Sequence, residues 1–126
     1  MKPLKKNNKR VFVLKKNTSF KKIFSLGLSF SSGDIVLMAL FRSGELGLVN
    51  IGFAVAKRPS FNSVKKNRIK RLLKEAVLKN IGFVNENFSS GDYIVLYSGS
   101  YPPSSAKISH AVLSAFKKLA PNKLNT

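Results

Sequence analysis

The sequence predicts a single α+β domain, an α/β sandwich in which helices pack on a mixed β-sheet with the order α-β-β-β-α-β-α. Two observations support this prediction. Segments with apolar residues at helical spacing alternate along the chain with short apolar segments typical of strands. A length of 126 residues with 44% hydrophobic residues suits one compact core and leaves no room for a second.

The first predicted element is a short amphipathic helix. Asn17 is a residue type that commonly begins helices, and Phe20, Ile23 and Phe24 follow it at i, i+3 and i+4 spacing. Gly27 then stands where a helix of this length would end.

Two or three strands are predicted next, and two of them are defined by the pattern. Residues 31–34 form a turn, residues 35–41 are a continuous apolar run typical of a buried strand, and residues 49–56 alternate between two faces. The larger side chains are Val49, Ile51, Phe53 and Val55, and the facing set is Asn50, Gly52, Ala54 and Ala56. The small face leaves room for another element. The turn spacing predicts that the two strands form an antiparallel hairpin.

The second half of the chain predicts a helix, a strand and a last helix. The first of these helices runs from about Val64 to Ile81 and ends at Gly82. A strand follows over residues 93–97. Ser104 or Ser105 then begins the last helix, whose apolar stripe repeats with a period close to 3.6 residues and which Pro121 ends. The stripe consists of Ile108, Ala111, Val112, Ala115, Phe116 and Leu119.

The charge predicts a polyanionic partner. The chain has 23 Lys and Arg residues against 5 Asp and Glu, a net charge of +18. Such a charge on a small domain attracts nucleic acid, because neutralised phosphates release condensed counterions. An anionic membrane surface and simple solubility are the competing explanations, and solubility needs far less charge. We expect residues 11–120 to form one RNA-binding domain between a flexible basic arm, residues 1–10, and a C-terminal tail, residues 121–126.

Several function classes lack support in the sequence. Without cysteine, disulfides and thiolate metal sites are excluded. No apolar run is long enough for a membrane span or a secretory signal, so we expect a cytoplasmic protein without a membrane partner. The acidic residues are scattered, and His110 lies opposite the apolar stripe of the last helix. We therefore expect no catalytic residue, no metal site and no cofactor bound by the protein.

The helix after Ser63 has two distinct faces. On a helical wheel, Ile69, Leu72, Leu73, Ala76 and Val77 share one arc, which predicts a core face. Lys66, Asn67, Lys70, Arg71 and Lys74 lie opposite, with Arg68 at their flank. A solvated helix that needs no ligand is the plain alternative. It is disfavoured because only Glu75 is available to pair with these cations, and like charges at i, i+4 repel.

Aromatic and basic residues also meet around the first helix. Phe20 and Phe24 lie beside Lys21 and Lys22, and opposite them we expect the small strand face with Gly52. Unpaired bases can stack on such rings with little sequence preference. Spacing alone slightly favours two ordinary core phenylalanines, and one ring could serve both purposes.

The stretch from Lys66 to Ala76, KNRIKRLLKEA, resembles the signature helix of the ribonuclease P protein family. The resemblance extends over roughly residues 14–119, including Phe20, Phe24 and the strand segments 52–57 and 92–95. Lys66 departs from the family pattern, because an arginine is usual there. Met38 stands where an aromatic residue is common in the cleft.

The resemblance implies a fold like the second domain of a ribosomal protein, with a left-handed βαβ crossover through the signature helix. It implies the protein subunit of a ribonucleoprotein endonuclease that trims the 5′ leader from precursor tRNA. Its RNA subunit would carry the catalysis with Mg²⁺, and no protein partner is implied. Another structured-RNA binder, such as a ribosomal protein, or a nuclease acting alone remain the alternatives.

The resemblance also assigns residues to two RNA surfaces. The RNA subunit would contact the signature helix and its preceding loop: Lys57, Arg58, Lys65, Lys66, Asn67, Arg68, Lys70, Arg71 and Lys74. The single-stranded leader of precursor tRNA would enter a cleft lined by Phe20, Lys21, Phe24, Met38, Gly52, Ala54 and Ala56.

Overall fold

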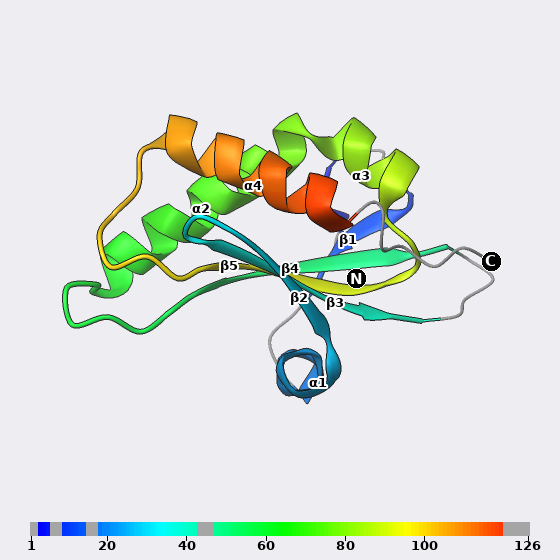
Figure 1. Ribbon diagram of the computed structural model, residues 1–126, viewed down its shortest axis with the longest axis horizontal. Helices are drawn as coiled ribbons and strands as arrows, with labels where there is room; N and C mark the ends of the chain where they lie inside the picture. The colour runs from blue at the N-terminus through cyan, green and yellow to red at the C-terminus, as the bar shows by residue number, and fades with distance from the viewer. Residues whose placement is uncertain (1–2, 6–8, 15–17, 43–46, 120–126) are drawn as a thin grey trace.

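The computed structural model describes residues 3–5, 9–14, 18–42 and 47–119. Its elements follow the order β-α-β-β-β-α-α-β-α (Figure 1). They are β1 (Val11–Val13), α1 (Thr18–Leu26), β2 (Leu28–Ser32), β3 (Ile35–Phe41), β4 (Val49–Val55), α2 (Ser63–Lys79), α3 (Ile81–Asn87), β5 (Gly91–Tyr97) and α4 (Ser105–Leu119). The mixed sheet with helices packed on it confirms the predicted fold class.

The sheet has the strand order β1-β4-β5-β3-β2. β5 is its central strand, parallel to β4 and antiparallel to β3. The predicted hairpin between residues 35–41 and 49–55 is therefore wrong, because β5 lies between the two strands. The true hairpin joins β2 to β3 through Gly33 and Asp34, and Gly33 adopts the positive φ of 56° that this tight turn needs.

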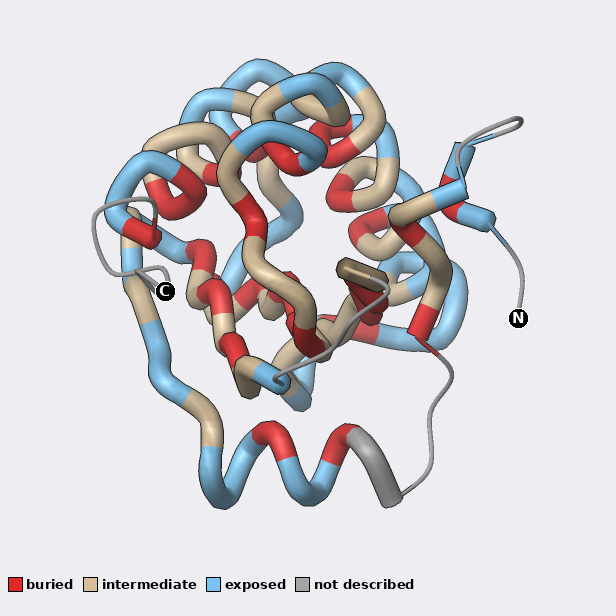
Figure 2. The backbone as a smooth tube through the Cα atoms, turned by 90° about the vertical axis from the view of Figure 1, so that its right-hand side faces the viewer, coloured by how far each residue is buried: buried red, intermediate tan, exposed pale blue. Residues whose placement is uncertain are grey.

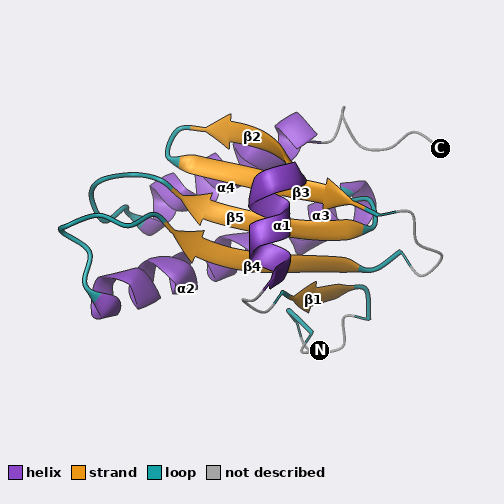
Figure 3. Ribbon diagram, turned by 90° about the horizontal axis from the view of Figure 1, so that it is seen from below, coloured by secondary structure: helices purple, strands orange, loops and turns teal. Residues whose placement is uncertain are grey.

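The connection from β4 through α2 to β5 is left-handed. In Figure 3, which shows the α1 side, β4 and β5 both point left, β5 lies above β4, and α2 lies behind the sheet. Crossovers between parallel strands are right-handed in nearly all proteins, so general rules do not predict this one. It agrees with the crossover that the family resemblance implies.

One face of the sheet carries the main core. α2, α3 and α4 cover this face, and α1 alone lies across the other (Figures 1 and 3). Tyr93 packs against Phe88, whose ring lies 4.9 Å from that of Phe116 in an edge-to-face arrangement. Figure 2 shows the buried positions concentrated between the sheet and these helices.

The second face carries a smaller cluster under α1. Leu14, Phe20 and Ile23 pack with Ile94 of β5. Met38, Leu40, Ala54 and Leu96 lie partly buried around them. The small side chains predicted along β4 do leave room for α1, which confirms that expectation.

The helix predicted to end at Gly82 ends earlier. Asn80 interrupts it, because the side-chain Nδ2 of Asn80 donates to the carbonyl of Ala76 over 2.8 Å. Gly82 lies inside the next helix, α3, so the predicted end is wrong. Neither this helix nor β1 is part of the predicted element order.

Parts of the predicted N-terminal arm pack on the domain. Leu4 is buried, and its N–H donates to the carbonyl of Val11 over 3.0 Å. Arg10 donates from its guanidinium to the carbonyls of Val84, Asn85 and Phe88, at the C-terminal end of α3. Carbonyls at a helix end lack intrahelical partners, so Arg10 caps α3. The boundaries of the predicted domain, arm and tail stay predictions, and residues 120–126 lie outside the described part.

The last helix begins as predicted. The hydroxyl of Ser104 accepts from the N–H of Lys107 over 3.2 Å, which caps α4 at its N-terminus. His110 is exposed, as expected for a residue opposite the apolar stripe. Across the described residues, no helix combines the length and the apolar character needed to cross a membrane.

Candidate nucleic-acid interface

The first candidate surface is the basic helix surface, formed by α2 and the loop before it. Its nine residues are those assigned to the RNA subunit above. Lys57, Lys65, Asn67, Arg68 and Arg71 are exposed, and Arg58, Lys66, Lys70 and Lys74 are half-buried. Ile69, Leu73, Ala76 and Val77 face the core and are buried. The predicted division of the helix into a core face and a basic face is confirmed.

The start of α2 concentrates positive charge. Asn62 caps it by accepting from the N–H of Lys65 over 2.9 Å, and its first turn carries no acidic residue. Free N–H groups and the helix dipole already make this end positive. Lys65, Lys66 and Arg68 add cations where helices ordinarily favour anions. An anion docked on this end would be attracted by both sources of charge.

Arg58 differs from the other members of the basic helix surface. Its guanidinium donates to the carbonyl of Lys57 over 3.0 Å and to that of Ser98 over 2.6 Å. The bond to Ser98 joins the loop before α2 to the end of β5. Arg58 therefore helps to hold the loop in place, and only the remaining N–H groups on Nη1 and Nη2 could reach a ligand, because Nε is buried.

The second candidate surface is called the α1 cleft. It consists of the seven residues that the resemblance assigns to the leader: Phe20, Lys21, Phe24, Met38, Gly52, Ala54 and Ala56. Its two phenylalanines behave differently. The Phe20 side chain is buried at 9% exposure, whereas Phe24 is 46% exposed. A Cβ added at Gly52 would lie only 2.5 Å from Cζ of Phe20, so the ring rests directly on the Gly52 backbone. Phe20 serves as core, and Phe24 presents an open ring.

The other residues assigned to the α1 cleft lie on α1 and on the sheet. Lys21 is exposed on α1, and Met38, Ala54 and Ala56 are half-buried on the sheet side. The N–H of Ala56 donates to the carbonyl of Tyr97 over 2.9 Å, which extends the β4–β5 pairing past the end of β4. The five residues from Gly52 to Ala56 span about 13 Å of extended chain. Lys57 follows directly, so β4 leads from the α1 cleft to the basic helix surface.

Two exposed apolar residues beside the cleft are absent from the predicted site. Leu26 is 66% exposed and Leu28 is 52% exposed, at the end of α1 and the start of β2. They follow Phe24 by two and four positions in the chain. Their sequence signal is weak, because a leucine near a helix end is usually a core residue.

The acidic side chains are spread over the molecule. Asp92 faces Arg42 at 3.4 Å and accepts from the side chain of buried Asn50 over 2.8 Å. Within the described ranges, no three His, Asp or Glu side chains lie close enough to hold a metal ion. The geometry of both surfaces suits binding of a polyanion, with stacking on Phe24 and charge on α2.

Comparison with known families matches residues 8–120 to the Ribonuclease P family. A ribonuclease P protein component of Natranaerobius thermophilus is 38% identical over 87 residues, covering 69% of this chain and 70% of that protein. One of Clostridium kluyveri is 29% identical over 108 residues, covering 86% of this chain and 94% of that protein.

Solved structures share the fold. The RNase P protein of Staphylococcus aureus superposes with a TM-score of 0.68 at 22% identity, covering 84% of this chain and 93% of that one. That of Thermotoga maritima also gives 0.68, at 20% identity, covering 88% of this chain and 97% of that one.

Proposed function

The chain belongs to the Ribonuclease P family and is a ribonuclease P protein component, and we propose that it gives this enzyme two separate RNA-binding surfaces. The basic helix surface binds the RNA subunit. The α1 cleft binds the single-stranded 5′ leader of precursor tRNA.

The assignment of α2 to the RNA subunit rests on one observation: its apolar and its basic side chains lie on opposite faces of the helix. Its core face is anchored in the sheet by four buried residues, so the opposite face is held rigidly. Arg68 and Arg71 are exposed on it, and a guanidinium can hold a phosphate through two parallel N–H groups. A rigid array of cations suits the fixed phosphate positions of a folded RNA better than those of a flexible strand.

The α1 cleft suits a flexible strand for the opposite reason. It offers one open ring, Phe24, and the exposed ammonium group of Lys21 one helical turn away. Stacking and a single cation fix a base and its phosphate without reading the sequence. Leaders of different sequence could therefore be held in the same place.

In this proposal the protein does no chemistry itself. The RNA subunit, with Mg²⁺, hydrolyses the phosphodiester bond. The protein holds the RNA subunit and the precursor tRNA in fixed positions relative to each other. By neutralising phosphates near their junction, it lowers the Mg²⁺ concentration that the complex needs. The place of action is the cytoplasm, where precursor tRNA is processed in a bacterial cell.

Reconstitution tests the proposal. RNA subunit, full-length protein and precursor tRNA are combined at low magnesium, and mature 5′ ends are scored. We expect cleavage that needs both components and that disappears when either is omitted. Cleavage by the protein without RNA would overturn the assignment of catalysis, and a folded protein that leaves the RNA unstimulated would overturn the subunit role.

A further inference from the structure

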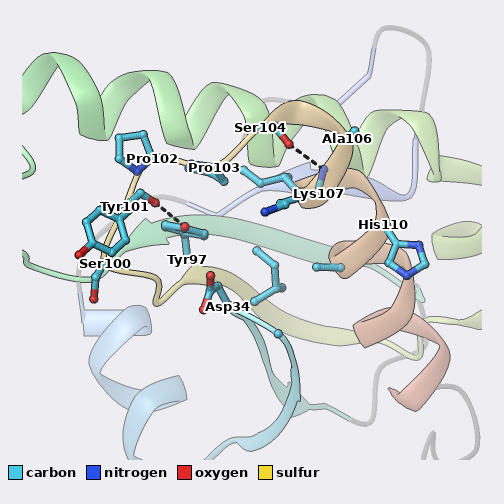
Figure 4. A pocket seen from close by; sticks show the side chains of 14 residues that line it. Asp34, Tyr97, Ser100, Tyr101, Pro102, Pro103, Ser104, Ala106, Lys107 and His110 are labelled. Carbon is cyan, nitrogen blue, oxygen red and sulfur yellow. Dashed lines mark hydrogen bonds between the residues drawn. The ribbon is translucent and has the colours of Figure 1, made fainter.

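A separate cavity of about 660 Å³ lies beyond both proposed surfaces. It opens between the β2–β3 turn, the end of β5, the loop of residues 98–104 and the first turns of α4 (Figure 4). None of its lining residues belongs to the basic helix surface or the α1 cleft. Its volume lies within the range of about 300–1,000 Å³ typical of small-ligand sites.

The inner wall of this cavity presents two polar groups. The hydroxyl of Tyr97 donates to the carbonyl of Tyr101 over 2.5 Å. The carboxylate of Asp34 lies next to it over Gly99, where an added Cβ would overlap the Tyr97 ring and come within 2.8 Å of Asp34 Oδ2. The carbonyl of Asp34 accepts from the N–H and the hydroxyl of Ser98, at 2.7 and 3.0 Å. The carboxylate therefore projects from a backbone that hydrogen bonds hold in place.

Tyr101 at the mouth is the second unusual feature. Its side chain is 79% exposed, more than that of any other large hydrophobic residue in the described ranges. Its carbonyl is bound by Tyr97, and Pro102 and Pro103 stiffen the chain after it. An exposed ring on a backbone that is held in position is available to stack against a flat partner.

α4 contributes the ammonium group of Lys107 and the imidazole of His110 to the same cavity. Lys107 and His110 are exposed and three residues apart, and both line the cavity. Figure 4 shows the Lys107 side chain reaching from α4 over the space between Tyr97 and His110. A ligand with both a flat ring and a negative charge would match Tyr101 and Lys107 together.

Two hydrogen bonds also connect the loop beside the cavity to the loop before α2. The hydroxyl of Ser60, in the loop before α2, donates to the carbonyl of Ser100 over 3.2 Å. Arg58 of the same loop binds the carbonyl of Ser98. An RNA strand that leaves the start of α2 can therefore continue across residues 98–101 to the cavity.

We propose that this cavity binds one unpaired nucleotide of an RNA strand, with its base stacked on Tyr101 and its phosphate against Lys107. The inference rests on the proposed RNA-binding function and adds a third contact to it. The carboxylate of Asp34 accepts hydrogen bonds and donates none, so it selects a base with donors on its edge. Guanine offers two adjacent donors, its N1–H and N2–H groups, and is the preferred base.

The chain lacks tryptophan, so Tyr101→Trp creates a single fluorescent reporter at the proposed site. The variant is titrated with short oligouridine strands that carry one central guanosine, one central adenosine or neither. We expect quenching by all three strands, with an affinity for the guanosine strand about tenfold above that of oligouridine. Introducing Asp34→Asn into the reporter should remove that preference and leave quenching intact.

Matched variants separate stacking from charge. Tyr101→Ala should weaken guanosine-strand binding about tenfold, and Tyr101→Phe, which keeps the ring, should not. Lys107→Ala should weaken binding more than Lys117→Ala, which removes the same charge from an exposed position on the same helix. Far-UV circular dichroism confirms that each variant is folded.

The outcomes distinguish this inference from the proposed function. If the tryptophan variant stimulates reconstituted cleavage but none of the three strands quenches its fluorescence, the cavity proposal is overturned and the subunit role stands. Equal affinity for all three strands overturns the role of Asp34 as a guanine-selecting group. A folded protein that neither binds RNA nor stimulates cleavage overturns both.

Discussion

The two faces of the sheet are built differently. The α2–α4 face is packed with large side chains, including Tyr93, Phe116 and Leu73, all at 0% exposure. The α1 face is covered by one nine-residue helix, and its strands present Gly52 and Ala54 to that helix. Stability is therefore concentrated on one face. The other face has a smaller core and the exposed ring of Phe24, on which the proposed RNA leader would stack.

Matched phenylalanine variants test this difference most strongly. Phe116→Ala should lower the free energy of unfolding by about 3–5 kcal/mol, because it empties a site enclosed by Phe88 and Phe83. Phe20→Ala should cost about half as much, because α1 can settle onto the sheet around the lost ring. Urea unfolding measures both. Equal losses would show that the two faces contribute alike to stability.

The next largest effect concerns the basic helix surface. Replacing Arg68 and Arg71 together by alanine should weaken binding to the RNA subunit by about 2–4 kcal/mol, because charge-assisted hydrogen bonds to phosphates are lost. The dependence of affinity on salt should become shallower, since fewer counterions are released.

The control for this variant is the pair Lys79→Ala and Lys117→Ala. It removes the same total charge from exposed positions at the ends of α2 and α4. If the control loses as much affinity as the arginine pair, the RNA responds to net charge and not to a specific surface.

Substitution of Phe24 should change RNA binding on the α1 face without changing the stability of the fold. Phe24→Ala should reduce affinity for leader-bearing precursor tRNA by about 1–3 kcal/mol, because one base loses its stacking partner. Affinity for mature tRNA and the free energy of unfolding should hardly change, since the ring is already 46% exposed. Filter binding with the two RNAs measures the difference, and an equal loss for both would remove Phe24 from the leader site.

Gly52 tests the close contact beneath α1. Gly52→Ala places a Cβ against the Phe20 ring and should destabilise the fold by about 1–3 kcal/mol through overpacking. In a Phe20→Leu background the same substitution should cost less, because the smaller side chain leaves space. Thermal unfolding of all four proteins gives the coupling energy. Additive losses would mean that the contact is not the cause.

Local patterns in the sequence predict much of this architecture. The alternation of residues 49–55 and the stripes of α2 and α4 report burial directly, because each face meets either core or solvent. Phe20 and Phe24 mark the right helix, but spacing alone does not reveal which ring is covered. That depends on Gly52, more than 25 residues away in the chain.

The features that the sequence does not predict depend on nonlocal or very short signals. β5 lies between β3 and β4 in the sheet although it follows both in the chain, so turn spacing between β3 and β4 suggests a false hairpin. β1 has three residues and gains its identity from parallel pairing with β4. The cavity beside Tyr101 combines the β2–β3 turn with α4, two regions about 70 positions apart.

The smallest effect at neutral pH concerns Tyr93, at the centre of the α2–α4 face. Burial raises the pKa of Tyr93 above its usual range, and the nearby Arg10 and Arg42 only partly oppose this shift. Its hydroxyl donates to the carbonyl of Ser89 over 2.5 Å, so Tyr93→Phe should cost about 1 kcal/mol at pH 7.

Above pH 10 the difference in stability between Tyr93→Phe and the unchanged protein should shrink. The unfolded state releases the Tyr93 proton near its ordinary pKa of about 10, whereas the folded state retains it. The stabilisation from a neutral Tyr93 is thus complete below pH 10 and is lost as the pH rises toward the folded-state pKa. Tyr93→Phe lacks this titration, so its stability should fall less steeply and approach that of the unchanged protein. Tyr101→Phe, at an exposed ring, is the control for the loss of a hydroxyl and should leave the free energy of unfolding at pH 7 unchanged. Parallel curves for Tyr93→Phe and the unchanged protein would show that the core on this face opens to water before Tyr93 ionises.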